Sequence, residues 1–190
     1  QYRDLAGTVR FEVVRKRDKS FSQRRPDPEK PGAWKWDLDG VERVPYKLPE
    51  LLAARPSETV YIVEGEKDAD AIAARKGVAT TNPGGAGKWI EPFSLYLTER
   101  SVVVLSDNDE PGRRHVERVA NSISSVAASV KVIGTFPGLE ERTGADVSDW
   151  FAAGHDLDDL YALADRTPVW VSGNQPSRSS SRFVTADELL

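Results

Sequence analysis

The stretch Val60-Tyr61-Ile62-Val63-Glu64-Gly65-Glu66-Lys67-Asp68 decides how this sequence folds. Its first four residues are β-branched or aromatic, as in a buried strand, and a helix-forming run then continues from residue 66 to residue 76. A strand that passes directly into a helix is the first half of a parallel β-α-β unit. We therefore expect Glu64 to lie at the carboxyl end of a strand, where open parallel sheets bind their ligands.

The same alternation of strand and helix continues downstream. Further strands are predicted near residues 78–81, 102–105 and 130–136, and helices near residues 66–76, 89–97, 111–128, 149–153 and 157–164. Gly77 is a C-cap signal for the first helix and Pro111 opens the third. The pattern predicts an α/β domain over residues 56–168, with a mostly parallel sheet flanked by helices.

A small β-rich lobe is predicted over residues 1–55, before this domain. Residues 9–14 alternate at the strand period, residues 20–23 form a possible second strand, and residues 47–54 indicate a short helix. Residues 169–190 have the composition of a linker followed by the start of another domain, and the chain contains no methionine. We therefore expect a fragment of a longer protein.

Composition excludes several kinds of site. The chain of 190 residues has no cysteine and only two histidines, so thiolate chemistry and cysteine-ligated zinc are excluded. No apolar run is long enough to cross a membrane and no signal peptide is evident, so a cytoplasmic location without a membrane partner is expected. Any metal chemistry must use carboxylates.

The net charge of −4 conceals two regions of opposite sign. Residues 1–55 carry 13 Lys and Arg against 9 Asp and Glu, a net of +4, while residues 56–190 carry 13 against 21, a net of −8. A basic lobe beside an acidic domain suits an enzyme that holds a phosphate backbone and metal ions, although ordinary surface variation gives the same difference.

Acidic residues gather in three short runs. The first two runs follow predicted strands, so their carboxylates should crowd at one sheet edge and repel one another unless a cation shares the site. Hard divalent ions such as Mg²⁺ or Mn²⁺ take such oxygen ligands. The candidate ligands are Glu64, Asp107, Asp109, Asp146 and Asp149, with Asp68 beside them. The alternative for the second run is a helix-capping turn with Asp109 as the N-cap.

Two of these runs resemble a known family. Glu64-Gly65-Glu66-Lys67-Asp68-Ala69, followed by Asp107-Asn108-Asp109, is similar to the Toprim domain of DnaG-type primases, topoisomerases, the RecR protein and certain nucleases. The resemblance covers roughly residues 58–166. It implies that Glu64 serves in acid/base or metal chemistry and that Asp107 and Asp109 bind Mg²⁺. Asp68 and Lys67 join Glu64 as candidate catalytic residues, and Lys67 either touches phosphate or only neutralises carboxylates.

Two other segments resemble the phage and plasmid primases, namely residues 80–89 and residues 144–150, and so does the lobe over residues 1–55. The third acidic run departs from the primase pattern, because Ala145 and Val147 replace a lysine and a proline. Either Asp146 ligates metal and Asp149 caps a helix, or the reverse.

A glycine-rich segment contains Gly84, Gly85, Gly87 and Lys88. It is not a P-loop, because Asn82 and Trp89 stand where that motif needs glycine and a hydroxyl residue. Its backbone donors and lysine are candidates for binding phosphate, and the alternative is a simple strand-to-helix loop.

The small lobe offers aromatic and cationic residues for nucleic acid. The candidates are Arg24, Arg25, Lys35, Trp34 and Trp36. Aromatic rings among cations suit single strands. The alternative is that the rings form the lobe's core, which is expected for at least one tryptophan. His115 is expected at the surface of its helix.

The resemblance and the residues together predict the catalytic fragment of a DNA primase. It would join ribonucleotides on a single-stranded DNA template, with two Mg²⁺ or Mn²⁺ ions and with nucleoside triphosphates as substrates, and the parent chain would carry a helicase domain. A Toprim nuclease and a noncatalytic nucleic-acid-binding module remain alternatives. A topoisomerase is disfavoured, because no companion domain with a strand-cleaving tyrosine is evident.

Overall fold

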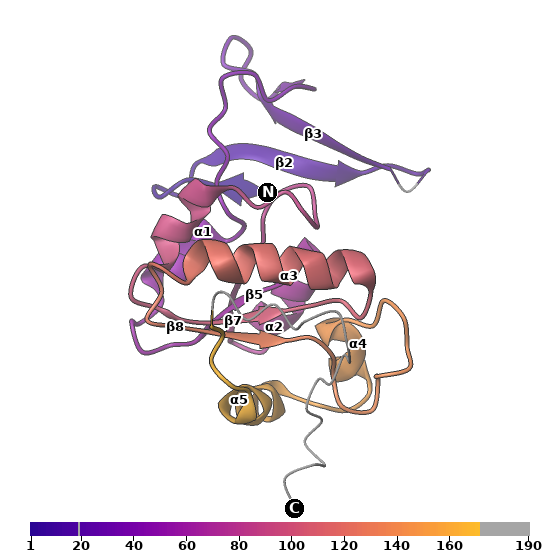
Figure 1. Ribbon diagram of the computed structural model, residues 1–190. Helices are drawn as coiled ribbons and strands as arrows, with labels where there is room; N and C mark the ends of the chain where they lie inside the picture. The colour runs from indigo at the N-terminus through magenta and orange to yellow at the C-terminus, as the bar shows by residue number, and fades with distance from the viewer. Residues whose placement is uncertain (19, 172–190) are drawn as a thin grey trace, which may run out of the picture.

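The computed structural model describes residues 1–18 and 20–171. They form an antiparallel sheet at the N-terminus and a parallel sheet covered by helices (Figure 1). The antiparallel sheet has the order β1-β2-β3-β4, with β1 at Tyr2–Arg3, β2 at Val9–Arg15, β3 at Phe21–Pro26 and β4 at Trp34–Lys35. The predicted linker and following domain lie, from residue 172 on, outside the described residues.

The second sheet is wholly parallel and has the order β6-β5-β7-β8. Its strands are β5 at Val60–Ile62, β6 at Val78–Thr80, β7 at Ser101–Leu105 and β8 at Ser129–Ile133. The predicted α/β fold is confirmed. Past the expected last helix, Trp170 donates its backbone N–H to Val130 O at 2.7 Å, so the chain continues along β8.

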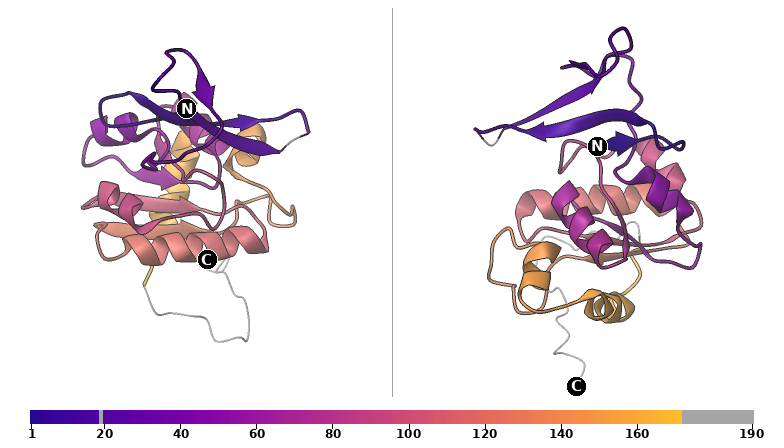
Figure 2. Two further views of the ribbon diagram at one scale, coloured as in Figure 1. Left: turned by 90° about the horizontal axis from the view of Figure 1, so that it is seen from above. Right: turned by 180° about the vertical axis from the view of Figure 1, so that it is seen from behind.

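Alternating side chains of the central strands enter two cores, so the domain has three layers. Val60, Ile62, Val102 and Val104 pack on the face covered by α1, α3 and the 3-10 helix η1. Tyr61, Val63, Val103 and Leu105 pack on the face covered by α2, α4 and α5. Figure 2 shows these layers from two further sides. The bounds are α1 Leu48–Ala53, α2 Glu66–Ala74, η1 Glu91–Leu97, α3 Glu110–Ile123, α4 Val147–Ala152 and α5 Leu157–Arg166.

Two local predictions differ from the structure. The segment near residues 89–97 forms a 3-10 helix, with Trp89 buried before it, and not an α-helix. After α2 the left-handed position is taken by Lys76, with a φ of 68°, and not by Gly77. Gly77 is required for space, because a Cβ there would lie 2.6 Å from Ile72 Cγ2.

The small lobe shares a core with the parallel sheet. Tyr2 and Phe11 stack with ring centroids 4.4 Å apart and belong to the cluster that contains Val60 and Val102. Tyr46 N donates to Thr81 O at 2.8 Å, and Thr80 Oγ1 donates to Tyr46 O at 2.7 Å. These contacts fix the lobe over the carboxyl end of β6.

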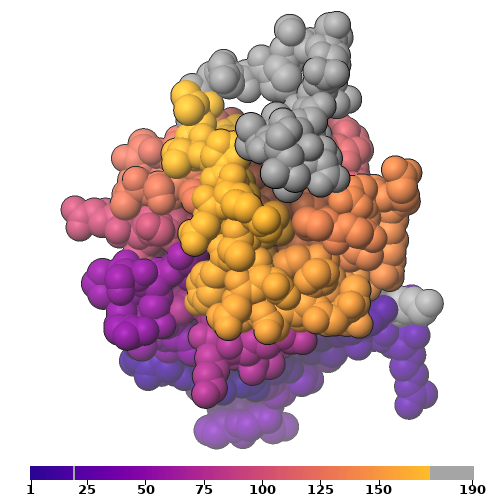
Figure 3. Space-filling model, turned by 90° about the horizontal axis from the view of Figure 1, so that it is seen from below, coloured from indigo at the N-terminus to yellow at the C-terminus, as the bar shows by residue number. Residues whose placement is uncertain are grey.

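The expectation of a tryptophan core for this lobe is wrong. Trp34 is half-buried and Trp36 is 58% exposed, because the core positions are filled by Tyr2, Phe11 and Val44. On the opposite side of the molecule, α4 and α5 cover the parallel sheet (Figure 3). Within the described residues, no helix is long and apolar enough to cross a membrane.

Candidate active site at the carboxyl end of the parallel sheet

Glu64 and Asp107 lie side by side where the adjacent strands β5 and β7 end. The backbone N–H of Asp107 donates to Glu64 Oε1 at 3.4 Å. This proximity follows from the parallel register, which pairs Ile62 with Val104. Glu64 comes two residues after Ile62, and Asp107 comes three residues after Val104. The structure therefore brings together the first two predicted acidic runs.

The three remaining predicted ligands of the second and third runs lie at the starts of helices. Asp109 is the N-cap of α3 and accepts a hydrogen bond from Gly112 N at 2.7 Å. Asp146 is the N-cap of α4, where it forms a capping box with Asp149. The helix-capping alternative is therefore confirmed for Asp109, and both members of the third run take part in one cap. Asp149 also accepts a hydrogen bond from Arg142 at 2.9 Å.

Lys67 and Ser148 tie the start of α2 to the start of α4. The Lys67 ammonium forms an ion pair with Asp146 and lies 3.7 Å from Asp68 Oδ1. Asp68 is only 5% exposed and accepts a hydrogen bond from Ser148 Oγ. The ammonium thus balances part of the negative charge, which is one of the two roles predicted for it.

Three carboxyl groups of the acidic cluster have raised pKa values. Burial, followed by the charges of Glu64, Asp68, Asp146 and Asp109, raises the pKa of Asp107 to about 8. Burial also raises the pKa of Glu64. The hydrogen bond from the backbone N–H of Asp107 lowers this pKa, and the charges of Asp109 and Asp68 raise it further. For Asp68, burial raises the pKa and Asp146 adds to the shift, while Ser148 and Lys67 oppose it. Carboxylates in this state favour a cation among them.

The donor set fits a hard divalent ion in chemistry, since all its ligands are carboxylate oxygens. Within residues 1–18 and 20–171, no three acidic or histidine side chains converge closely enough to hold such an ion as they stand. Two of these carboxylates are already engaged, since Asp146 pairs with Lys67 and Asp68 accepts a hydrogen bond from Ser148.

Replacing Asp107 with asparagine is expected to stabilise the metal-free protein. Because the pKa of Asp107 is raised, its contribution to stability is present below pH 4 and is lost as the pH rises through about 8. Allowing for partial exposure, the gain at pH 8 is about 1–3 kcal/mol, or about 2–10 °C in melting temperature. Thermal unfolding of both proteins in EDTA at several pH values measures this gain. If the difference between their melting temperatures did not widen between pH 4 and 8, the raised pKa of Asp107 would be contradicted.

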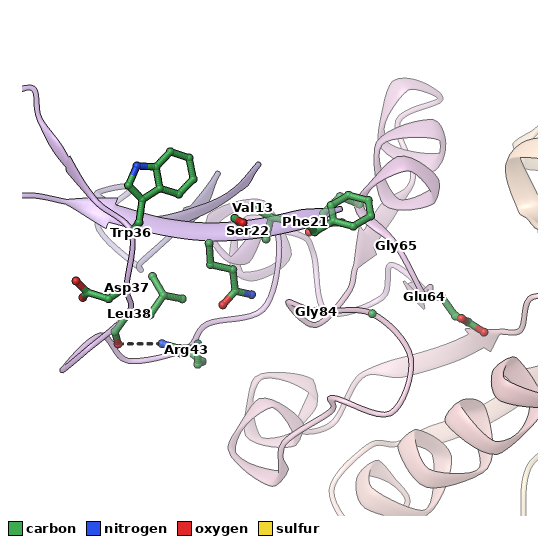
Figure 4. Close-up of a pocket in the computed structure, with 13 residues that line it drawn as sticks. Val13, Phe21, Ser22, Trp36, Asp37, Leu38, Arg43, Glu64, Gly65 and Gly84 are labelled. Carbon is green, nitrogen blue, oxygen red and sulfur yellow. Dashed lines mark hydrogen bonds between the residues drawn. The ribbon is translucent and has the colours of Figure 1, made fainter. Parts of the chain in front are cut away.

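A pocket of about 710 Å³ joins the acidic cluster to the small lobe. Glu64, Gly65, Gly84 and Gly85 line it from the parallel domain, and the lobe contributes Trp36, Arg43 and their neighbours (Figure 4). Two of the four predicted phosphate-binding residues, Gly84 and Gly85, therefore reach the same pocket as Glu64, whereas Gly87 and Lys88 do not line it.

The predicted nucleic-acid cations are all paired with carboxylates of the lobe. Arg24 pairs with Glu12 across two strands, and its guanidinium lies 4.5 Å from the ring of Trp34 and 5.1 Å from that of Trp36. Arg25 pairs with Asp37 at 2.7 Å, and Lys35 lies 3.3 Å from Asp27. Trp36 is the member of the set that lines the pocket, and it is 58% exposed although Arg24 lies over its ring.

Two residues of α3 matter here in ways that sequence reasoning missed. His115 is 2% exposed, so the expectation of a surface residue is wrong. It lies on the same face as the buried Val116 and Val119 because α3 packs across the sheet. Gly112 is buried against Glu64, Asp107 and Ser106. Glycine in the first turn of a helix, directly after proline, was the available signal, because glycine there is unfavourable unless space requires it.

Comparison with known proteins gives matches among solved structures. Neither a protein-family model nor a curated protein sequence matches the chain. The Aquifex aeolicus primase, with its zinc-binding and RNA polymerase domains, aligns with 89% of the chain at 18% identity and a TM-score of 0.63. The E. coli primase catalytic core aligns with 88% of the chain at 17% identity and a TM-score of 0.59. The chain has the fold of a DNA primase catalytic core.

A phage protein has the same fold. A chain from the structure of the bacteriophage T7 lagging-strand DNA polymerase interacting with primase domains aligns with 89% of this chain at 18% identity, with a TM-score of 0.57. This chain covers 76% of that T7 chain, but only 51% of the E. coli core and 40% of the Aquifex aeolicus protein. It thus spans about half the length of the bacterial primases that it matches.

Proposed function

We propose that this chain is the catalytic part of a DNA primase, which joins ribonucleotides on a single-stranded DNA template. The observation that carries the proposal is the placement of Glu64 and Asp107 side by side at the ends of β5 and β7, with Glu64 lining a pocket shared with the small lobe, in a fold shared with primase cores. One similar structure is described as a DnaG primase catalytic domain bound to single-stranded DNA, at a TM-score of 0.52.

Glu64, Asp107, Asp109 and Asp146 would hold the divalent ions, two Mg²⁺ or Mn²⁺, with Asp68 alongside. Asp146 is preferred to Asp149, because the charge of Asp146 acts on Asp107. Bound ions would neutralise charge on the transferring phosphoryl group and orient the attacking 3′-hydroxyl. Release of Asp146 by Lys67 would leave the ammonium free to face a phosphate.

The test is primer synthesis with labelled ribonucleotides on single-stranded DNA, for this chain and for its full-length parent with any helicase domain attached. We expect weak synthesis by the chain alone and stronger synthesis by the parent, because a second DNA-binding domain raises the effective concentration of template. A nuclease would instead shorten the DNA without nucleotides. DNA binding without any product in the parent would favour the noncatalytic module.

The path of the template is better assigned to unpaired cations than to Arg24, Arg25 and Lys35. A second hollow of about 420 Å³ extends past Trp36 and is lined by Lys16, Ser22 and Gln23. Lys16 is exposed and, within the described residues, forms no ion pair. A lysine that does not have to break an ion pair with a carboxylate contributes more fully to phosphate binding.

Replacing Lys16 with alanine is expected to weaken binding of single-stranded DNA similarly for all sequences. The slope of log affinity against log salt should fall by about 0.7, the value for one phosphate contact on a single strand. Lys35→Ala is the matched control, and because Lys35 is paired with Asp27 its slope should change less. Fluorescence titration with labelled oligonucleotides at four salt concentrations measures both, and an unchanged slope for Lys16→Ala would place the template elsewhere.

A further inference from the structure

In the described part of the chain, the glycine segment over residues 84–88 is hydrogen-bonded to α3 through the backbone N–H and C=O of one residue, Gly87. Gly87 N donates to His115 Nδ1 at 3.0 Å, and Arg118 Nη1 donates to Gly87 O at 2.7 Å. His115 and Arg118 are three positions apart on α3, so they lie on neighbouring parts of its surface. One helix therefore holds the segment from both sides of the same residue.

His115 is suited to accept this hydrogen bond only as a neutral ring. Because Nδ1 accepts from Gly87, the ring proton lies on Nε2, which has no hydrogen-bond partner in the described part of the chain. Burial, with the nearby charge of Arg118, lowers the pKa of His115 to about 4. The ring is therefore neutral at physiological pH, and keeping an unpartnered N–H buried there is a cost that the contact with Gly87 offsets.

The segment held in this way presents free backbone donors. Gly84 and Gly85 have positive φ angles of 89° and 75°, which places successive peptides in a conformation that glycine alone adopts readily. Among the described residues, no hydrogen bond is donated by the backbone N–H groups of Gly84 and Ala86, whereas the N–H of Gly85 closes the turn over residues 83–84. Gly84 and Gly85 line the pocket that also contains Glu64, and successive backbone N–H groups in a turn form anion-binding concavities.

The same helix also fixes the acidic cluster. It begins at Asp109, whose side chain caps it, and Gly112 in its first turn packs against Glu64 and Asp107. The position of the free N–H groups relative to the carboxylates is thus set by α3. Because Gly84 and Gly85 line the same pocket as Glu64, a nucleotide in this pocket would contact both the glycine segment and the edge of the acidic cluster.

We propose that His115 and Arg118 are positioning residues that hold the segment over residues 84–88 as the triphosphate-binding wall of the pocket. The inference rests on the proposed function, because it assumes a nucleoside triphosphate as the substrate. It assigns to the two side chains no contact with the substrate. Their effect passes through the backbone of Gly87.

The experiment measures binding of ATP with Mg²⁺, and of adenosine alone, by titration calorimetry. His115→Leu removes the acceptor and should weaken ATP binding about tenfold, the value of one hydrogen bond, while leaving adenosine unchanged. His115→Asn places an amide oxygen near the position of Nδ1 and should restore most of the affinity. Arg118→Ala, at an exposed site, should also weaken ATP binding. Glu117→Ala, on the adjacent exposed position, is the control.

Binding of Mn²⁺ in the absence of nucleotide, followed by electron paramagnetic resonance, should be the same in all these variants. Equal affinity for ATP in Arg118→Ala, His115→Leu and the unchanged chain would overturn the inference and leave the proposed function standing. Failure of His115→Asn to recover affinity would also overturn it. If the unchanged chain bound Mn²⁺ but no ATP, both proposals would be wrong. If His115→Leu unfolds at a lower temperature than the unchanged chain, the ATP affinity of Arg118→Ala decides the test.

Discussion

Replacing Glu64 with glutamine is expected to reduce primer synthesis at least about a hundredfold, the lower end of the range for losing an acid/base group. Glutamine keeps the size of the side chain and an oxygen that accepts from Asp107 N, but it has no charge and no basicity. The fold should persist, because burial and neighbouring carboxylates raise the pKa of Glu64 and its charge is therefore unfavourable in the folded protein. Unfolding would then not explain the loss of synthesis. Removing the charge should leave the melting temperature in EDTA equal or higher.

The measurement is incorporation of labelled ribonucleotides on single-stranded DNA, in the same protein that is used to test the proposed function. Glu110→Gln is the matched control, since Glu110 is exposed and pairs with Arg113 and Arg114 at the start of α3. It should keep near-normal synthesis. Retained activity in Glu64→Gln would remove Glu64 from the mechanism. Mn²⁺ binding provides an independent readout and should weaken in Glu64→Gln only.

Asp109 is a poorer residue for this test than the sequence suggested. A loss of activity in Asp109→Ala would combine the loss of a candidate metal ligand with the loss of the N-cap of α3, which costs about 1 kcal/mol. Glu64 caps no helix, so its substitution separates chemistry from folding.

The sequence was sufficient to predict the parallel sheet and the meeting of its carboxylates. Strand period and the direct passage from strand to helix place Glu64 and Asp107 at one edge, because parallel strands end together. These are local properties, and the register of adjacent strands converts them into one long-range contact.

The charge pairing could not be predicted in the same way. Arg24 pairs with Glu12 because β2 and β3 align those two residues, and Lys67 reaches Asp146 across 79 positions of sequence. Such pairs depend on register and on packing between helices, which composition and spacing do not encode. His115 was misplaced for a related reason, since the buried face of α3 is wider than the aliphatic residues alone indicate.

Replacing Gly112 with alanine is expected to destabilise the protein, although alanine is the better helix former. A Cβ on Gly112 would meet the Glu64 carboxylate, would lie 2.5 Å from the backbone oxygen of Asp107, and would lie 3.0 Å from Ser106 Oγ. The Asp107 oxygen cannot yield easily, because it accepts hydrogen bonds from Asp109 N and Ser106 Oγ, both at 2.7 Å. The first turn of α3 must therefore move away from the sheet.

Overpacking of this kind costs about 1–3 kcal/mol. Alanine gains about 1 kcal/mol from its higher helix propensity, so the net change is destabilising when the cost lies toward the upper end of its range. The same movement displaces Glu64 and the Asp109 cap, so primer synthesis and Mn²⁺ binding should fall with stability. Glu117→Ala, further along the exposed face of α3, should change stability by less than about 0.5 kcal/mol. Thermal unfolding of the two variants makes the comparison. A melting temperature for Gly112→Ala at or above that of the unchanged chain would show that α3 does not press on the carboxylates, and the link between the helix and the acidic cluster would then be lost.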